Sequence, residues 1–183
     1  LAVPSADRIL MLAQALRLGL STEEIHSIAK YDPWFIEQVR LIIDAEQNVR
    51  ENGLPTDKNE FINLKSLGMS DERLAELSGL KESEVLDKRY ALGIKPSYKR
   101  IDTCAAEFES QTPYLYSSYE RDAAGISECE AEPTDAKKIV ILGGGPNRIG
   151  QGIEFDYCCV HGVYAAKECG YETIMINCNP ETV

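Results

Sequence analysis

The loop between Ile141 and Tyr157, ILGGGPNRIGQGIEFDY, has the residue types of a ligand-binding motif. Five glycines fall within residues 143–152, directly after a short apolar run. Glycine lets a backbone approach a ligand closely, and the usual ligand of such a loop is a phosphate group. The residues between the glycines decide whether the loop follows a known phosphate-binding pattern.

The loop departs from both common phosphate patterns. The dinucleotide fingerprint needs glycine at its first, third and sixth positions, and counting from Gly143 the sixth residue is Arg148. A Walker A loop needs Lys and then Ser or Thr after its last glycine, where this sequence has Gln151 and Gly152. Glu181 lies where the fingerprint has its ribose-binding acid, so a fragment of a nicotinamide-dependent Rossmann enzyme stays open as an alternative.

The elements around the loop form one βαβ unit. A short buried strand over 139–142 precedes the loop, a helix follows from about 153 to 168, and a second strand covers 173–177. A parallel pair alone leaves open edges and one bare face. We therefore expect residues 138–183 to be a truncated α/β, Rossmann-like unit whose remaining strands lie in sequence not present here.

The first part of the chain is typical of short helices with clear start and stop signals. Ser5 is expected to cap the first helix, Ser21 and Glu24 form a capping box, and Asp32 with Pro33 begins the third helix. The six predicted helices lie near 5–19, 21–30, 33–53, 61–68, 74–77 and 85–92. Together they predict a mainly α-helical domain.

The third helix carries many apolar residues. We expect its core face to consist of Phe35, Val39, Ile42 and Val49, with Ile36 and Ile43 beside them. Trp34 suits either core packing or an interface with a partner. Residues 94–118 are less regular and end in tyrosines, so we assign 1–119 to the helical domain with an extended tail.

The charge pattern limits the partners of the chain. Its net charge is -11, and residues 120–137 are acidic, small and polar, so we assign them to a linker. Residues 74–94 have the pattern of a helix-turn-helix: a short helix, a glycine turn and a second helix. This leaves a helical interaction or DNA-binding module as a second alternative. Because acidic residues there balance Lys81, Lys88 and Arg89, we expect no nucleic-acid binding. No apolar run approaches the roughly 20 residues of a membrane span, so we expect no membrane partner.

The cysteines do not indicate a metal centre. Six are present, none forms a CxxC pair, and the chain has only two histidines. We therefore expect no metal site and mostly buried, reduced thiols in a cytoplasmic protein.

Three long strings resemble the large subunit of carbamoyl phosphate synthetases. They are GGGPNRIGQGIEFDYCCVH at 143–161, YETIMINCNPETV at 171–183 and YKRIDTCAAEF at 98–108. The helical region has the order and length of the oligomerization domain that lies between the two synthetic halves in that family. The resemblance covers essentially the whole chain.

The resemblance implies an ATP-dependent ligase of pyrimidine and arginine biosynthesis. In that family, two ATP-grasp sites, with ATP and Mg or Mn, make carbamoyl phosphate from bicarbonate and ammonia. A glutaminase small subunit releases the ammonia from glutamine, and carbamate crosses a tunnel between the two sites. The ATP-grasp sites lie outside this chain, so we expect no catalytic, cofactor-binding or metal-binding residue in it. We expect its partners to be the small subunit, the rest of the large subunit and further copies bound through the helical domain.

The same resemblance assigns the loop to the tunnel wall. Carried over by motif, the tunnel positions are Arg148, Gly152, Glu154 and Glu181. A glycine at 152 leaves a narrow bore open, and a carboxylate near a helix N-terminus is favoured by the helix dipole. Helix capping, or pairing with Arg148, stays open as a structural role for both carboxylates.

Overall fold

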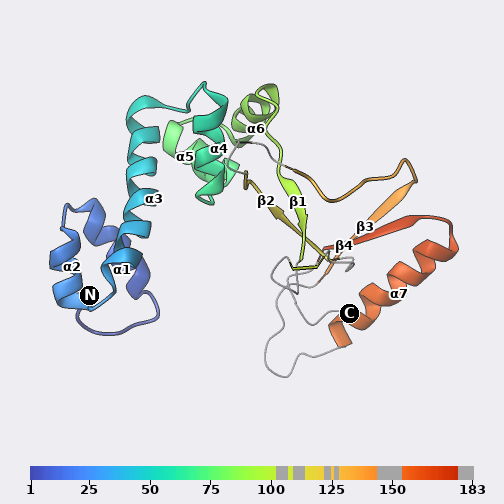
Figure 1. The fold of residues 1–183 in the computed structure, drawn as a ribbon, viewed down its shortest axis with the longest axis horizontal. Coiled ribbons are helices and arrows are strands. Elements are labelled where there is room, and N and C mark those ends of the chain that lie inside the picture. Colours follow the sequence, from blue (N-terminus) through green and yellow to red (C-terminus); the bar gives the residue numbers. More distant parts are fainter. Residues whose placement is uncertain (102–106, 109–113, 122–124, 126–127, 144–153, 177–183) are drawn as a thin grey trace. The chain divides into compact units, whose positions relative to one another are not determined.

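The computed structural model describes residues 1–101, 107–108, 114–121, 125, 128–143 and 154–176, with the side chains of 154–156 outside the description (Figure 1). The chain forms two compact units, Leu1–Ala131 and Glu132–Val183. We call them the helical unit and the α/β unit. The predicted fold class, a mainly α-helical region followed by a βαβ unit, is confirmed.

The helical unit contains the six predicted helices. Their bounds are α1 (Arg8–Arg17), α2 (Thr22–Ala29), α3 (Pro33–Asn52), α4 (Lys58–Ser66), α5 (Asp71–Ser78) and α6 (Glu82–Ala91). The capping box of Ser21 and Glu24 is present, and the Asp32 side chain accepts a hydrogen bond from Trp34 N. The predicted Ser5 cap is wrong: α1 begins after Asp7, and Ser5 contributes only its carbonyl, to Arg8 N.

Two hydrophobic clusters form the core of the helical unit, and α3 contributes to both. The first cluster joins α1, α2 and the start of α3 around Leu12, Ile25 and Ile36. The second joins the end of α3 to α4, α5 and α6 around Phe61 and Leu74. Figure 1 shows α1 and α2 beside one end of α3 and α4–α6 near the other. Helix α3 therefore links two separately packed layers.

The core face predicted for α3 is partly wrong. Ile36, Ile43 and Val49 are buried, whereas Phe35 and Ile42, which we placed on the core face, are exposed. The helix has two adjacent apolar arcs, and only one of them packs inward. The other arc is exposed.

A β-hairpin follows the helices and was not predicted. Strands β1 (Ser97–Arg100) and β2 (Leu115–Ser118) pair antiparallel, with Ser97 opposite Ser118 and Arg100 opposite Leu115. Glu130 covers the other edge of β1, because its N–H bonds Tyr98 O at 2.7 Å and its carboxylate accepts from Arg100 N at 2.5 Å. A residue of the predicted acidic linker thus bonds to the edge of this small sheet.

The α/β unit is the predicted strand, helix and strand. Strands β3 (Lys138–Leu142) and β4 (Glu172–Ile176) are parallel, with Ile139 opposite Thr173 and Leu142 opposite Ile176. Helix α7 (Glu154–Glu168) packs against both strands, and a Cβ added to Gly162 would lie 3.5 Å from Ile141 Cδ1. The other face of the pair is apolar and exposed, consisting of Val140, Leu142, Ile174 and Ile176.

Candidate functional site

Three of the four predicted tunnel positions, and the side chain of the fourth, lie outside the described residues. Gly143 N donates a hydrogen bond to Ile176 O at 2.8 Å, so the carboxyl ends of β3 and β4 lie side by side. Ligands of open α/β sheets bind outside the carboxyl ends of the strands. Arg148, Gly152 and Glu181 follow these strand ends in sequence and lie outside the described residues. Glu154 is the first residue of α7, and its side chain also lies outside the description.

Helix α7 presents an aromatic row that the sequence analysis did not identify. Tyr157, His161 and Tyr164 follow one another at helical spacing, with ring centroids 4.2 Å apart for the first pair and 6.2 Å for the second. Both tyrosines are exposed. The imidazole ring of His161 lies between the two tyrosine rings. The signal was its spacing of four and three residues from the tyrosines.

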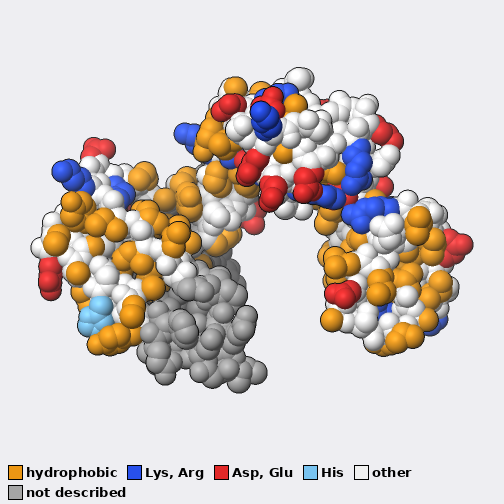
Figure 2. All heavy atoms as spheres, turned by 180° about the vertical axis from the view of Figure 1, so that it is seen from behind, with side chains coloured by type: hydrophobic (Ala, Val, Ile, Leu, Met, Phe, Trp, Pro, Cys, Tyr) orange, Lys and Arg blue, Asp and Glu red, His pale blue; other side chains and the backbone are white. Residues whose placement is uncertain are grey.

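The clearest surface feature of the helical unit is an apolar row on α3, which we call the α3 stripe. It consists of Trp34, Phe35, Leu41 and Ile42, whose exposed fractions are 61%, 57%, 53% and 37%. The spacing of seven residues from Trp34 to Leu41 and from Phe35 to Ile42 keeps the four side chains on adjoining arcs of the helix. Figure 2 shows hydrophobic side chains over much of the N-terminal helices, at the right in that view. Surface helices normally present polar residues to water, so the stripe is suited to contact another protein surface.

A buried carboxylate joins the two layers of the helical unit. The side chain of Glu46 on α3 is 7% exposed. Its Oε2 accepts a hydrogen bond from Arg17 Nη2 of α1 at 2.9 Å, and its Oε1 accepts from Arg73 Nη2 of α5 at 2.6 Å. Arg50 adds a longer ion pair of 3.7 Å to Oε2. We call these four residues the Glu46 cluster.

The pKa of Glu46 reflects this environment. Burial by itself raises the pKa of the carboxyl, but hydrogen bonds and charges from Arg17 and Arg73 outweigh burial and hold the pKa below 4.5. Glu46 is therefore an anion near neutral pH. It connects a helix of the first core cluster to a helix of the second.

A second buried ion cluster lies within α4, α5 and α6. Arg89 donates to both oxygens of Asp71, with Nη2 2.8 Å from Oδ2, and Lys65 Nζ lies 2.8 Å from Oδ1. Lys65 also donates to Met69 O and Arg89 to Ile94 O. Burial raises the pKa of Asp71, but hydrogen bonds from Arg89 and Lys65 outweigh burial and hold it below 3.8.

The four thiols that the structure describes differ from the expectation of mostly buried thiols. Cys129, Cys158 and Cys169 are exposed and Cys159 is half-buried, all four as free thiols. Among the described residues, no group of three or more His, Cys, Asp and Glu side chains is placed to hold a metal ion. Within the same part of the chain, no helix is both long and apolar enough to cross a membrane.

Comparison with protein families assigns these two units. Residues 1–93 match the model of the carbamoyl-phosphate synthetase large chain, oligomerisation domain, and residues 135–183 match the model of the carbamoyl phosphate synthase preATP-grasp domain. The chain belongs to the carbamoyl phosphate synthase large-chain family. The resemblance found in the three sequence strings is thereby confirmed: the six helices of the helical unit match the oligomerisation domain, and the α/β unit matches the start of the preATP-grasp domain.

Curated members of the carbamoyl phosphate synthase large-chain family are similar to the chain over its whole length. The large chain of Rhizobium meliloti is 58% identical over 183 residues, which cover 100% of this chain and 16% of the relative. Those of Neisseria meningitidis serogroup A and Pseudomonas aeruginosa are 54% and 52% identical, each over 100% of this chain and 17% of the relative. The chain thus spans about a sixth of the length of these relatives.

Proposed function

We propose that this chain is the central segment of a glutamine-dependent carbamoyl phosphate synthase, in which the helical unit mediates assembly and the glycine loop contributes to the carbamate tunnel. The complete cytoplasmic enzyme makes carbamoyl phosphate from bicarbonate, ammonia released from glutamine by a small subunit, and two ATP. Its ATP and Mg or Mn sites lie outside these residues, so the chain by itself is inactive. The observation that carries the assembly role is the α3 stripe on a unit that matches the oligomerisation domain.

The α3 stripe binds a second copy of the chain through apolar contact. Four large side chains on one helix expose enough apolar surface to form the centre of an interface, and aromatic residues such as Trp34 and Phe35 commonly anchor such centres. The stripe is separate from the core, because the side chains that stabilise the fold point from the other arc, at Ile36, Ile43 and Val49. Assembly can therefore be disrupted without disturbing the fold.

Light scattering behind a sizing column, across a dilution series of the chain, tests the assembly role. The wild-type chain is expected to persist as an oligomer on dilution, and Leu41→Glu to dissociate it by burying a charge at the centre of the interface. The matched control is Tyr90→Glu, which adds the same charge at a 52% exposed aromatic position on α6. A monomeric wild-type chain, or equal behaviour of the two variants, would contradict this role of the stripe.

Two observations support the tunnel role: the sequence motif, and the start of the loop at the carboxyl end of β3. Gly152 has no side chain and keeps the bore open, while Arg148, Glu154 and Glu181 supply charged and hydrogen-bonding groups along the wall. These groups suit carbamate, a small anion that gains a proton to become a neutral acid. None of the four residues has a catalytic role in this proposal.

Gly152→Phe in the complete enzyme tests the tunnel role. Bicarbonate-dependent ATP hydrolysis is expected to continue while carbamoyl phosphate formation falls, because the phenyl ring blocks passage between the two active sites. Gly152→Ala is the control, since a methyl group narrows the bore far less. Equal losses of both activities in Gly152→Phe would indicate misfolding and count against a tunnel at this position.

A further inference from the structure

A hollow of about 430 Å³ lies in the helical unit, and no residue of the α3 stripe is among its described lining residues. Its described lining comes from α4, from the segment that leads into β1, and from residues that follow β2. These are Lys58, Ile62, Gly93, Ile94, Lys95, Pro96, Ser97, Arg121, Gly125 and Cys129. The volume falls within the range of small-molecule sites, which is roughly 300–1,000 Å³.

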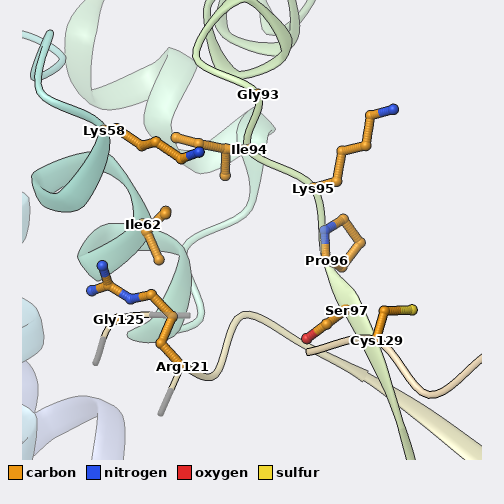
Figure 3. Close-up of a pocket in the computed structure, with 10 residues that line it drawn as sticks. All are labelled: Lys58, Ile62, Gly93, Ile94, Lys95, Pro96, Ser97, Arg121, Gly125 and Cys129. Atoms are coloured by element: carbon orange, nitrogen blue, oxygen red, sulfur yellow. The ribbon is translucent and has the colours of Figure 1, made fainter. Parts of the chain in front are cut away.

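The lining of the hollow is mixed, with three apolar side chains, of which Ile94 is almost fully buried, and a basic rim. Figure 3 shows Ile62, Ile94 and the ring of Pro96 around the hollow, with the Lys58 side chain reaching across to Ile94 and the Lys95 ammonium extending away. Three cations, Lys58, Lys95 and Arg121, line it, and no acidic residue is found among the described lining residues. This is a local exception in a chain of net charge -11.

The three rim cations differ from the buried cations of the same unit in having no anionic partner. Within the described part of the chain, none of them forms an ion pair, whereas Lys65 and Arg89 are paired with Asp71. Lys95 lies 5.9 Å from the ring of Tyr90, a contact that leaves its charge uncompensated. An anion entering the hollow would meet cations that no carboxylate of the described chain neutralises.

Arg121 is held in place by neutral groups. Its Nη1 donates to Asn59 Oδ1 at 2.9 Å and its Nη2 donates to Asn63 Oδ1 at 2.6 Å. These amide oxygens fix the guanidinium against α4 without cancelling its charge. A cation fixed before the ligand arrives loses little conformational entropy on binding.

We propose that this hollow binds a small organic phosphate whose compact apolar body packs on Ile62 and Pro96 while its charged group contacts Lys58 and Arg121. Ile62 and Pro96 offer apolar contact to an organic group, and the cations without an acidic partner favour an anionic ligand. Lysine acts as a mobile point charge that binds phosphate, and Lys95 can turn inward from its present position. Because the hollow lies in the helical unit only, this site is independent of the proposed assembly and tunnel roles.

Three probes distinguish the contribution of apolar contact from that of charge. Each is titrated into the isotopically labelled chain, and binding is followed by two-dimensional NMR. Phenyl phosphate carries both the body and the charge, inorganic phosphate carries only the charge, and phenol carries only the body. Phenyl phosphate is expected to shift the amide resonances around Ile62 and Ile94 saturably, and to bind more tightly than either of the other two. Absence of saturation up to 10 mM, or equal binding of inorganic phosphate, would overturn the proposal.

Lys58→Met and Lys88→Met form the matched pair of variants. Lys88 is an exposed lysine of α6 that does not line the hollow. Losing one charge-assisted hydrogen bond should weaken phenyl phosphate binding about tenfold to a hundredfold in Lys58→Met and leave Lys88→Met unchanged. Far-UV circular dichroism and the unfolding midpoint show whether Lys58→Met is folded.

Ile62→Ala is the second variant, and it removes most of the apolar contact that Ile62 offers. It is expected to weaken phenyl phosphate binding but not the weak binding of inorganic phosphate. Equal affinities in Lys58→Met and Lys88→Met would mean that binding follows the general charge of the chain, and the assigned site would be wrong.

Discussion

Replacing Glu46 by Gln tests how the two helical layers are joined. The glutamine keeps the size of the side chain and one acceptor oxygen, but it removes the negative charge that Arg17 of α1 and Arg73 of α5 share. The carboxylate is almost fully buried, at 7% exposure, whereas the three arginine side chains are 32–39% exposed. The variant therefore leaves the arginines without their anion and only partly hydrated.

The expected loss lies between two limits. Removing one partner of a fully buried ion pair costs roughly 3–5 kcal/mol, and an exposed pair contributes only about 0–1 kcal/mol. The Glu46 cluster has a buried anion and partly exposed cations, which can recover some hydration in the variant. We expect Glu46→Gln to lower the free energy of unfolding of the helical unit by about 2–3 kcal/mol.

Glu76→Gln is the matched control. Glu76 also pairs with Arg73, at 2.7 Å, but its side chain is 59% exposed. Its loss is expected to cost at most about 0.5 kcal/mol, because water screens the pair in the native state. The two variants thus remove different anions from the same arginine and differ mainly in burial.

The pH dependence of the difference in unfolding free energy between wild type and Glu46→Gln gives a second test. The pKa of Glu46 in the folded chain is held below 4.5, its ordinary value. A lowered folded pKa contributes stability that is present above the unfolded pKa and is lost as pH falls through the folded pKa. The gap between wild type and Glu46→Gln should therefore be full near pH 7 and should shrink as pH falls below about 4.5.

Urea unfolding followed by helical circular dichroism measures the loss, and amide hydrogen exchange locates it. The single tryptophan, Trp34, is a poor fluorescent reporter because it is 61% exposed in the folded chain. Exchange should accelerate in both α1 and α5 in Glu46→Gln, since the carboxylate holds both helices. A loss no greater than that of Glu76→Gln, or faster exchange confined to α3, would refute the idea that Glu46 joins the layers.

Two further substitutions follow from the same structure. Asp71→Asn leaves Lys65 and Arg89 buried without an anion and should cost about 3–5 kcal/mol in urea unfolding at pH 7, a loss that fades as pH falls through the lowered pKa of Asp71; an unchanged midpoint would show that the two cations rehydrate freely. Ser21→Ala removes the side-chain half of the capping box of α2 and should cost about 1 kcal/mol, measured in the same way, while a loss near zero would show that Glu24 maintains the cap by itself.

The sequence predicted the helices well because their signals are local. Capping residues, prolines and glycines act within a few residues of a helix end, so the capping box of Ser21 and the start at Pro33 could be recognised in the sequence. The hairpin of β1 and β2 was missed for the opposite reason. Its strands are four residues each and are separated by 14 residues, 101–114, so no turn signal joins them.

The candidate site was harder to predict because its parts come from distant positions. Nothing near Glu46 in the sequence indicates that this acid is buried, since Arg17 and Arg73 lie 29 and 27 residues away. The two apolar arcs of α3 gave a similar difficulty. Periodicity shows that a residue such as Phe35 lies on an apolar face, but it does not show which of two faces packs inward.

Helix α3 carries the assembly surface and the core contacts on different arcs, so assembly and stability can be altered by different substitutions. Comparing Leu41→Glu with Glu46→Gln therefore tests the proposed function more strongly than either variant does by itself. Leu41 lies on the exposed stripe and Glu46 on the buried arc of the same helix. Leu41→Glu should dissociate the oligomer with little effect on the unfolding of the dissociated chain, and Glu46→Gln should weaken folding while the stripe itself is unchanged. If each variant altered both properties equally, the stripe and the core would be one cooperative surface, and the assignment of α3 to two separate roles would be wrong.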